Sequence, residues 1–377
     1  MNNRERLLAV LAHQPPDRIP WIPRLELWYE ARRRNGTMPV RWAGRSLREI
    51  ERALGLGTPA REGRVFTQVY DGVEIVQRNE GERAITEYHT PVGTVCSVSR
   101  GSAELNAVGI GGRVEEYPLK TPADYAVWTW IVERARWLPT PDAYAAYDCE
   151  IGDDGLPMVN VGDVPFHHWM LELAGYDHAF YHLADYPHEV EHLVQTMAQV
   201  ERERLWPVLA ASPTRLLLHG VHLSSAFTPP PLFRRYILPY YEQLMPVLHA
   251  AGNAVTMHAD NDTSLILELI ERAGWDMVEC FVTAPMVPVT LQRARAVWGD
   301  RVIIWGGVPS ALLSPHVPED EFRAYVEGLF DTIAPGNAFI LGVADNVMPD
   351  SLIERVAWIT ETVERRGQYP VRSRLDS

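Results

Sequence analysis

From about residue 156 onward, short apolar runs alternate with longer stretches of helical periodicity. The apolar runs predict strands at residues 158–161, 215–218, 254–257, 277–279, 302–305 and 338–341. Helices are expected between them at residues 188–206, 232–251, 264–273, 291–298, 319–334 and 351–366. Strands and helices that alternate in this way form βα units around a parallel sheet. We therefore predict an α/β fold, a (β/α)8 TIM barrel, and not an open doubly wound sheet, because no Gly-x-Gly-x-x-Gly turn follows the first strand.

The N-terminal part of the chain carries different patterns. Residues 2–13 place Leu7, Leu8 and Leu11 at helical spacing, which predicts an N-terminal helical extension. Residues 19–25 predict the first strand. Residues 64–99 change to an alternation of apolar and polar positions, which predicts an inserted β-hairpin or meander. The expected organisation is one barrel domain over residues 1–377 that carries this insertion.

Composition and charge narrow the class of protein. Hydrophobic residues make up 46% and charged residues 22% of the chain, a balance typical of a globular protein. The net charge of -14 would repel phosphate backbones and anionic lipid, so binding to nucleic acid or to a membrane is disfavoured. We find no apolar run of membrane-spanning length and no signal-peptide pattern, and the three cysteines are widely spaced. A cytoplasmic protein in a reducing compartment is expected.

Polar side chains follow several of the predicted strands. In a parallel barrel the loops after the strands converge on one rim, and the reactive groups lie there. His258 and Asp260 are two positions apart at a strand end, so both side chains should face the barrel axis. With Asp345, which ends the last strand, they predict a site for a divalent cation such as zinc, manganese or iron. The alternative is a His–Asp hydrogen bond without a metal.

Other strand ends offer candidate catalytic groups. Asp163 would place an acid near the substrate, or would serve as the N-cap of the next helix. His222 has either a direct role or a packing role, and Glu279 either completes the metal site or acts as an acid or base. Cys280 follows Glu279 on its strand, so it should face the opposite side as a buried structural thiol. The 12 Trp and 15 Tyr residues favour a cavity lined with aromatic rings, although most of these rings will belong to the core.

Several short motifs give the chain a resemblance to a known superfamily. They are Asn3-Arg4-Glu5-Arg6, Pro15-Pro16-Asp17-Arg18-Ile19-Pro20, Thr90-Pro91-Val92-Gly93-Thr94, Leu173-Ala174-Gly175-Tyr176, Asp185-Tyr186-Pro187-His188, Leu238-Pro239-Tyr240-Tyr241 and His249-Ala250-Ala251-Gly252. Over nearly its whole length the chain resembles uroporphyrinogen decarboxylases and the related corrinoid-linked methyltransferases. The resemblance implies a barrel enzyme that acts on a small molecule.

The decarboxylase branch carries an Arg-Gln-Ala-Gly-Arg segment whose arginines grip the carboxylates of the substrate. In this chain Arg24 stands in the equivalent place but is followed by Leu25-Glu26-Leu27, so most of that clamp is missing. Arg24, Asp71 and Tyr240 are the predicted substrate-binding residues.

The methyltransferase branch binds zinc through a His-x-Cys pair and a later Cys. His258, Asp260 and Asp345 occupy those places, and both thiolates are replaced by carboxylates. Carboxylates make the site harder, which suits an oxygen-bearing substrate better than a thiol. The resemblance therefore implies a corrinoid carried by a partner protein, together with a divalent metal at these three residues.

Three functions follow from these patterns. The leading hypothesis is a metal-dependent, methyltransferase-like enzyme that moves a methyl group between a small substrate and a corrinoid. The second is a metal-free decarboxylase of a carboxylated, tetrapyrrole-like substrate, in which Asp71 or Asp163 steadies a protonated intermediate. The third is a non-catalytic ligand-binding barrel. The substrate and the choice between a monomer and a homodimer stay open.

Overall fold

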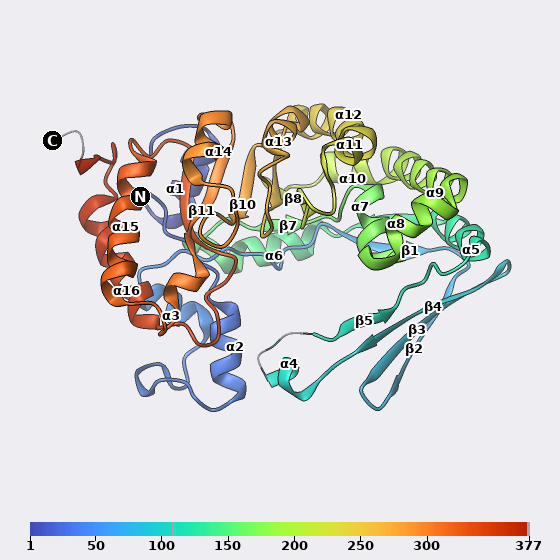
Figure 1. Cartoon of the computed structure of the whole chain (residues 1–377), viewed down its shortest axis with the longest axis horizontal. Helices are drawn as coiled ribbons and strands as arrows, with labels where there is room; N and C mark the ends of the chain where they lie inside the picture. Colours follow the sequence, from blue (N-terminus) through green and yellow to red (C-terminus); the bar gives the residue numbers. More distant parts are fainter. Residues whose placement is uncertain (108, 110, 375–377) are drawn as a thin grey trace.

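The computed structural model describes residues 1–107, 109 and 111–374 (Figure 1). Its centre is a parallel sheet whose strands follow one another in chain order. These strands are β7 (Met158–Asn160), β8 (Leu216–Val221), β9 (Ala254–His258), β10 (Met277–Phe281), β11 (Ile303–Pro309) and β12 (Phe339–Ala344). Nearly every residue in them is buried, as expected for parallel strands that are covered on both faces.

Two short N-terminal segments close this sheet into a barrel. Trp21 forms a parallel bridge to Leu341 of β12 at one edge. At the other edge the backbone N–H of Met158 in β7 donates to the carbonyl of Ala60 at 2.9 Å. The two segments are joined where the N–H of Gly57 donates to the carbonyl of Trp21 at 3.0 Å. Hydrogen bonds therefore run round the whole barrel, and the predicted TIM-barrel class is confirmed.

The helices that connect the strands lie on the outside of the barrel. Helix α15 (Glu319–Ile333) buries Phe322, Val326 and Phe330 at helical spacing, which shows the amphipathic pattern that the sequence predicts. The remaining covering helices are α7 (Pro165–His168), α8 (Tyr176–Asp185), α9 (Pro187–Val200), α10 (Trp206–Ala210), α11 (Pro230–Leu232), α12 (Leu238–Ala250), α13 (Leu267–Ala273), α14 (Leu291–Trp298) and α16 (Ile353–Arg366). Single π-helical turns, η3 (Trp169–Ala174), η4 (Glu201–Leu205) and η5 (Phe233–Ile237), continue α7, α9 and α11.

The N-terminal helix α1 (Asn3–Leu11) closes the bottom of the barrel. It begins with a capping box, in which the Asn2 side chain accepts from the N–H of Glu5 and the Glu5 side chain accepts from the N–H of Asn2. Its buried Leu7 and Val10 pack with side chains from inside the barrel, including Met277. The opposite rim, where the strands end, is left for the site.

The other elements flank the barrel. The helices are α2 (Glu26–Arg34), α3 (Leu47–Ala53), α4 (Ala103–Ala107), α5 (Pro122–Val132) and α6 (Pro141–Ile151), with 3-10 turns η1 (Val40–Trp42), η2 (Gly152–Asp154) and η6 (Ser310–Leu313). In the part of the chain that the structure describes, no helix has the length and apolar character needed to cross a membrane.

A second sheet stands apart from the barrel in Figure 1. It is antiparallel and consists of β2 (Glu74–Glu80), β3 (Arg83–Thr90), β4 (Gly93–Arg100) and β5 (Arg113–Glu116), in that order. Strand β1 (Phe66–Tyr70) instead pairs antiparallel with β6 (Ala135–Pro139) beside the barrel. The ring of Tyr88 in β3 packs edge-on against Trp128 of α5, with ring centroids 5.1 Å apart, and this contact ties the second sheet to the body of the protein.

Candidate functional site

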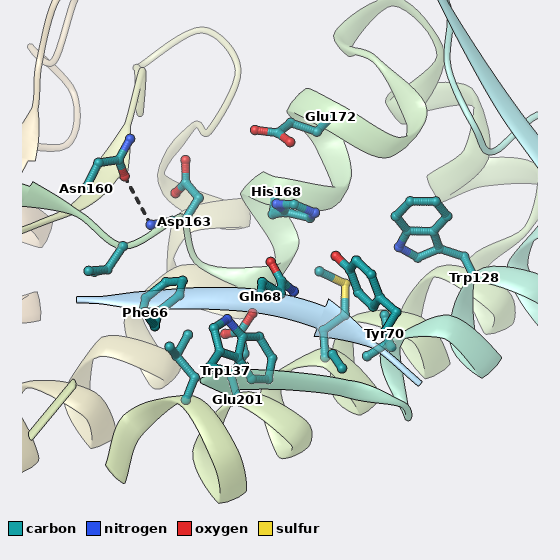
Figure 2. A pocket seen from close by; sticks show the side chains of 16 residues that line it. Phe66, Gln68, Tyr70, Trp128, Trp137, Asn160, Asp163, His168, Glu172 and Glu201 are labelled. Carbon is teal, nitrogen blue, oxygen red and sulfur yellow. Dashed lines mark hydrogen bonds between the residues drawn. The ribbon is translucent and has the colours of Figure 1, made fainter. Parts of the chain in front are cut away.

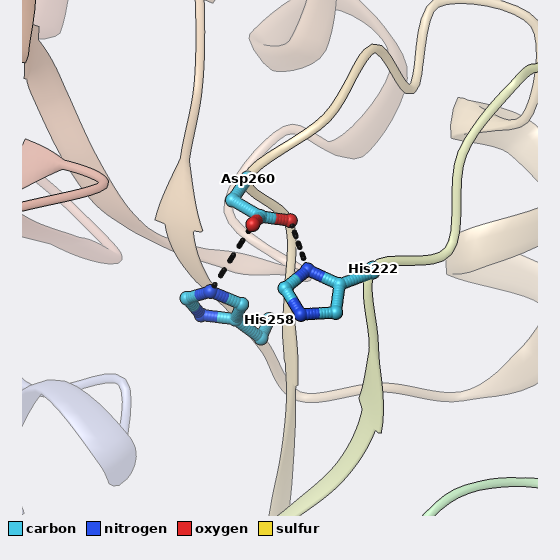
Figure 3. Close-up of side chains that lie close together, drawn as sticks. All are labelled: His222, His258 and Asp260. Carbon is cyan, nitrogen blue, oxygen red and sulfur yellow. Dashed lines mark hydrogen bonds and ion pairs between the residues drawn. The ribbon is translucent and has the colours of Figure 1, made fainter. Parts of the chain in front are cut away.

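The imidazole of His258, at the end of β9, is the centre of a polar cluster on the C-terminal rim of the barrel. Its Nε2 atom lies 3.7 Å from Oδ2 of Asp260 and 3.6 Å from Oδ1 of Asp345 (Figure 3 shows the first pair). His258 is buried, whereas the two carboxylates are partly exposed at the barrel mouth. The structure therefore brings together the three residues that the sequence predicts for the metal site.

Glu279 of β10 fixes the orientation and tautomer of His258. Its Oε2 atom lies 2.7 Å from Nδ1 of His258, and its Oε1 atom accepts from Arg61 at 2.5 Å. Burial by itself raises the pKa of Glu279, but the charge of Arg61 and the contact with His258 outweigh this and hold the pKa well below its usual range. Because this carboxylate accepts a hydrogen bond from Nδ1 of His258, Nε2 is the ring nitrogen that faces Asp260 and Asp345.

His222, in the loop after β8, completes a second side of the cluster. Its Nδ1 atom lies 2.7 Å from Oδ1 of Asp260, and this hydrogen bond raises the pKa of His222 (Figure 3). The backbone of His222 has φ +59°, a left-handed conformation that is costly for a residue with a β-carbon. His222, His258 and Asp260 each offer a ligand atom within 4.8 Å of the others. Two imidazoles and one carboxylate form a donor set that suits zinc, iron or manganese.

Asp345 is also engaged by neighbouring side chains. Its Oδ1 atom accepts from Arg24 at 2.6 Å, and its Oδ2 atom accepts from Asn346 at 2.7 Å. Burial lowers the pKa of Arg24, but the negative groups around it outweigh burial and raise it, so the guanidinium stays charged. Arg24 therefore lies inside the cluster, where it neutralises Asp345.

Cys280 lies on the same side as Glu279, and the expectation that it faces the opposite side is wrong. Its Sγ atom donates to Oε1 of Glu279 at 2.9 Å. The reason is local, because Cys280 has φ +52° and the pairing of β10 with β11 shifts register between Val278 and Phe281, which breaks the alternation of a regular strand. Burial raises the pKa of Cys280 well above its usual value, so this side chain is a buried thiol as expected.

Asp163 ties two barrel loops together. Its Oδ2 atom accepts from the N–H of Val221, at the end of β8, at 3.2 Å and lies 2.8 Å from Nδ1 of His167. Its Oδ1 atom accepts from the N–H of Val164, and Val164 itself is the N-cap of α7. Asp163, the predicted catalytic acid, is therefore held by contacts with Val164, His167 and Val221, and it lies beside the loop that carries His222.

Two of the predicted substrate-binding residues, Tyr240 and Asp71, lie away from the cluster around His258. Tyr240 is buried in α12 on the outside of the barrel, where its hydroxyl donates to Glu201 at 2.6 Å. Asp71 follows β1 and forms an exposed ion pair with Arg136 at 2.8 Å. In the described residues neither side chain contacts the cluster around His258, because a helix and a strand outside the barrel carry them away from its mouth.

Sequence reasoning missed Arg61. This residue follows the short barrel segment at residues 57–60, and its partner Glu279 lies 218 positions further along the chain. The same argument from strand ends would have found Arg61, but the segment is too short to produce a strand pattern.

A cavity of about 330 Å³ lies beside β7 (Figure 2). Strands β1 and β6, helix α5 and the turns η3 and η4 enclose it together with the loop after β7. Asp163 links this cavity to the cluster around His258, since it lines the cavity and also contacts Val221, the residue before His222.

The fold and the site define a barrel enzyme with its polar groups on the C-terminal rim of the strands. The sequence profile of uroporphyrinogen decarboxylase (URO-D) matches residues 169–366. The chain belongs to the uroporphyrinogen decarboxylase family and is an enzyme of decarboxylase or methyltransferase type. This confirms the resemblance that the motifs indicate.

Solved structures support the fold. A methyltransferase from Methanosarcina mazei is similar over 97% of this chain and 99% of its own, with 14% sequence identity and a TM-score of 0.57. A dipeptide epimerase from Methylococcus capsulatus, complexed with a Mg ion, matches 80% of each chain at 15% identity, but its TM-score of 0.25 is too low for a conclusion. No curated protein matches this chain significantly.

Proposed function

We propose that this chain is a metal-dependent enzyme that moves a methyl group between a small, oxygen-bearing substrate and a corrinoid carried by a partner protein. The observation that carries the proposal is the geometry of His258, whose Nε2 atom faces Asp260 and Asp345 while Nδ1 is held by Glu279. Membership of the URO-D family, together with the fold shared with a methyltransferase, supports the reaction type.

The donor atoms fit a divalent cation. His222, His258 and Asp260 would supply two nitrogens and one oxygen, and Asp345 would add a second oxygen once it is released from Arg24. All of these donors are nitrogen or oxygen atoms, which are borderline or hard ligands, and the sulfur of the adjacent Cys280 is a buried thiol with a raised pKa. A bound cation would act as a Lewis acid on an oxygen of the substrate.

The surrounding residues would hold this donor set in place. Glu279 keeps a proton on Nδ1 of His258, and Arg61 keeps Glu279 ionised. Glu279 is a positioning residue in this scheme, because both of its oxygens are occupied and its side chain is 1% exposed. Arg24 would balance the charge of Asp345 until a cation or an anionic substrate group takes its place.

Metal analysis tests the proposal directly. The purified full chain should bind about one equivalent of zinc, manganese or iron in a competitive titration. The His258→Ala variant should lose this binding, and the Asp71→Asn variant should retain it, because Asp71 lies in an exposed ion pair outside the cluster. If the wild-type chain takes up no stoichiometric metal, the proposal is wrong.

A second candidate is a metal-free decarboxylase, and the two arginines at the barrel mouth favour it. Arg24 and Arg61 are each about one-fifth exposed, at 19% and 20%, and could exchange their present partners for carboxylates of a substrate. Asp163 would then be the nearby acid, since Asp71 lies elsewhere. Release of carbon dioxide from uroporphyrinogen in the presence of a chelator would support this candidate, and no release would remove uroporphyrinogen as its substrate.

A further inference from the structure

The cavity beside β7 has aromatic walls. Phe66 and Tyr70 of β1, Trp137 of β6 and Trp128 of α5 all line it (Figure 2). Trp128 is buried and Trp137 is partly buried. With about 330 Å³, the cavity has the size of a site for a small organic molecule.

Three carboxyl groups line this cavity, beside the polar side chains of Gln68, Asn160 and His168. Asp163, Glu172 and Glu201 line it, and no lysine or arginine among the described residues does. Glu172 is exposed and makes no hydrogen bond or ion pair with any described residue. The cavity therefore combines aromatic rings with three carboxyl groups and with no lysine or arginine among the described residues, which is the chemistry that attracts a cation with apolar substituents.

Glu201 is the carboxylate that the fold holds most firmly in this cavity. Its Oε2 atom accepts from the hydroxyl of Tyr240 at 2.6 Å, and that hydroxyl also accepts from Nε1 of Trp206 at 3.1 Å. Burial raises the pKa of Glu201 to about 8, although the hydrogen bond from Tyr240 lowers it. An ionised carboxylate at this depth lacks a positive partner, and a bound cation would supply one.

We propose that this cavity is a binding site for an organic cation, an alkylammonium group that carries methyl substituents. The rings of Trp128 and Trp137 would contact the methyl groups, and Glu201 and Glu172 would balance the charge. A hydrated metal ion fits less well, because four aromatic rings offer it no ligand.

This inference does not depend on the metal site. The two sites adjoin at Asp163, whose Oδ2 atom contacts the backbone of Val221 next to His222. An alkylammonium ligand in the cavity would therefore lie on the barrel side that carries the proposed metal cluster. The cavity itself contains no atom of His222, His258 or Asp260.

The test is isothermal titration calorimetry of the full chain with choline and with tetramethylammonium, in a buffer that contains EDTA. Choline should bind saturably, and dimethylbutanol, its uncharged isostere, should bind at least about tenfold more weakly. The total tryptophan fluorescence of the chain should change with the same midpoint, because Trp128 and Trp137 line the cavity. Because EDTA is present, a failure of metal binding leaves this result untouched.

Three variants locate the site. Glu201→Gln should weaken choline binding by about tenfold or more, and Glu172→Gln should weaken it by a smaller factor. Glu172→Gln guards against a folding defect, because the exposed Glu172 side chain makes no hydrogen bond or ion pair with a described residue. Glu203→Gln is the matched control, since Glu203 lies in the same helical turn, is exposed and does not line the cavity. Absence of saturable binding by both cations, equal binding of the uncharged isostere, or unchanged affinity in both cavity variants would overturn the proposal.

Discussion

His258 and Glu279 lie in register on the paired strands β9 and β10, and their side chains meet at 2.7 Å between Nδ1 and Oε2. Parallel pairing places the two strand ends side by side, so an imidazole and a buried carboxylate form a fixed pair. The pair fixes the imidazole so that Nε2 of His258 is directed at Asp260 and Asp345. The orientation of His258 in the proposed metal site thus depends on Glu279, a residue whose side chain is 1% exposed.

The first prediction concerns this pair. Glu279→Gln should lower the affinity of the chain for zinc by about 10- to 100-fold, because the neutral amide no longer selects the Nδ1 tautomer of His258. Competition with a chromophoric chelator measures the change. Circular dichroism should show a folded protein, and Glu361→Gln, an exposed position in α16, is the control. An unchanged zinc affinity in Glu279→Gln would contradict the positioning role.

The second prediction concerns the pH dependence of cation binding. Burial raises the pKa of Glu201 to about 8, so the affinity for choline should rise as the pH approaches that value and level off above it. The charge of Asp163 contributes to the raised pKa of Glu201, and Glu172 and His168 also line the cavity. Titrations across this range measure the effect, which Glu201→Gln should largely abolish. A flat affinity profile in the wild-type chain would show that Glu201 takes no part.

The third prediction concerns stability. Glu51 in α3 is 3% exposed, and burial raises its pKa from 4.5 to about 8. Between these values the folded chain keeps a proton that the unfolded chain has lost, so this group makes the folded state less stable as the pH rises. The difference in unfolding free energy between Glu51→Gln and wild type should therefore grow in favour of the variant between pH 4.5 and about pH 8, by at most about 1.4 kcal/mol per pH unit. Thermal unfolding at about pH 5 and about pH 9 tests the sign. If the difference in stability between Glu51→Gln and wild type becomes smaller toward alkaline pH, the prediction is wrong.

The fourth prediction concerns Gly220 in β8. This residue has φ +99°, and an added β-carbon would lie 2.9 Å from the hydroxyl of Tyr241. Gly220→Ala should therefore destabilise the fold by about 1–3 kcal/mol. Gly328→Ala is the matched control, since Gly328 lies inside α15 with open space around it, and should stabilise the fold by about 0.5–1 kcal/mol. Denaturant unfolding of the two variants should shift in opposite directions.

The strands and covering helices of the barrel could be predicted because each is a local pattern. The apolar run at residues 254–257 became β9, and the helical periodicity at residues 319–334 became α15. The approach of His258 and Asp260 also follows from local geometry, since they lie two positions apart where β9 ends and an extended chain directs such side chains to the same side.

Tertiary structure decided the rest. Three features of the site depend on contacts between residues tens to hundreds of positions apart. These are the approach of Asp345 to His258, the ion pair of Arg61 with Glu279, and the position of Tyr240 among the outer helices. The cavity beside β7 depends on the same kind of contact, because β1, β6 and η4 meet there only after the barrel has formed. The periodicity of the sequence determines which residues share a face of one helix or strand. The packing of helices and strands against one another determines which faces meet, and only this packing brings charged groups and aromatic rings from distant segments together.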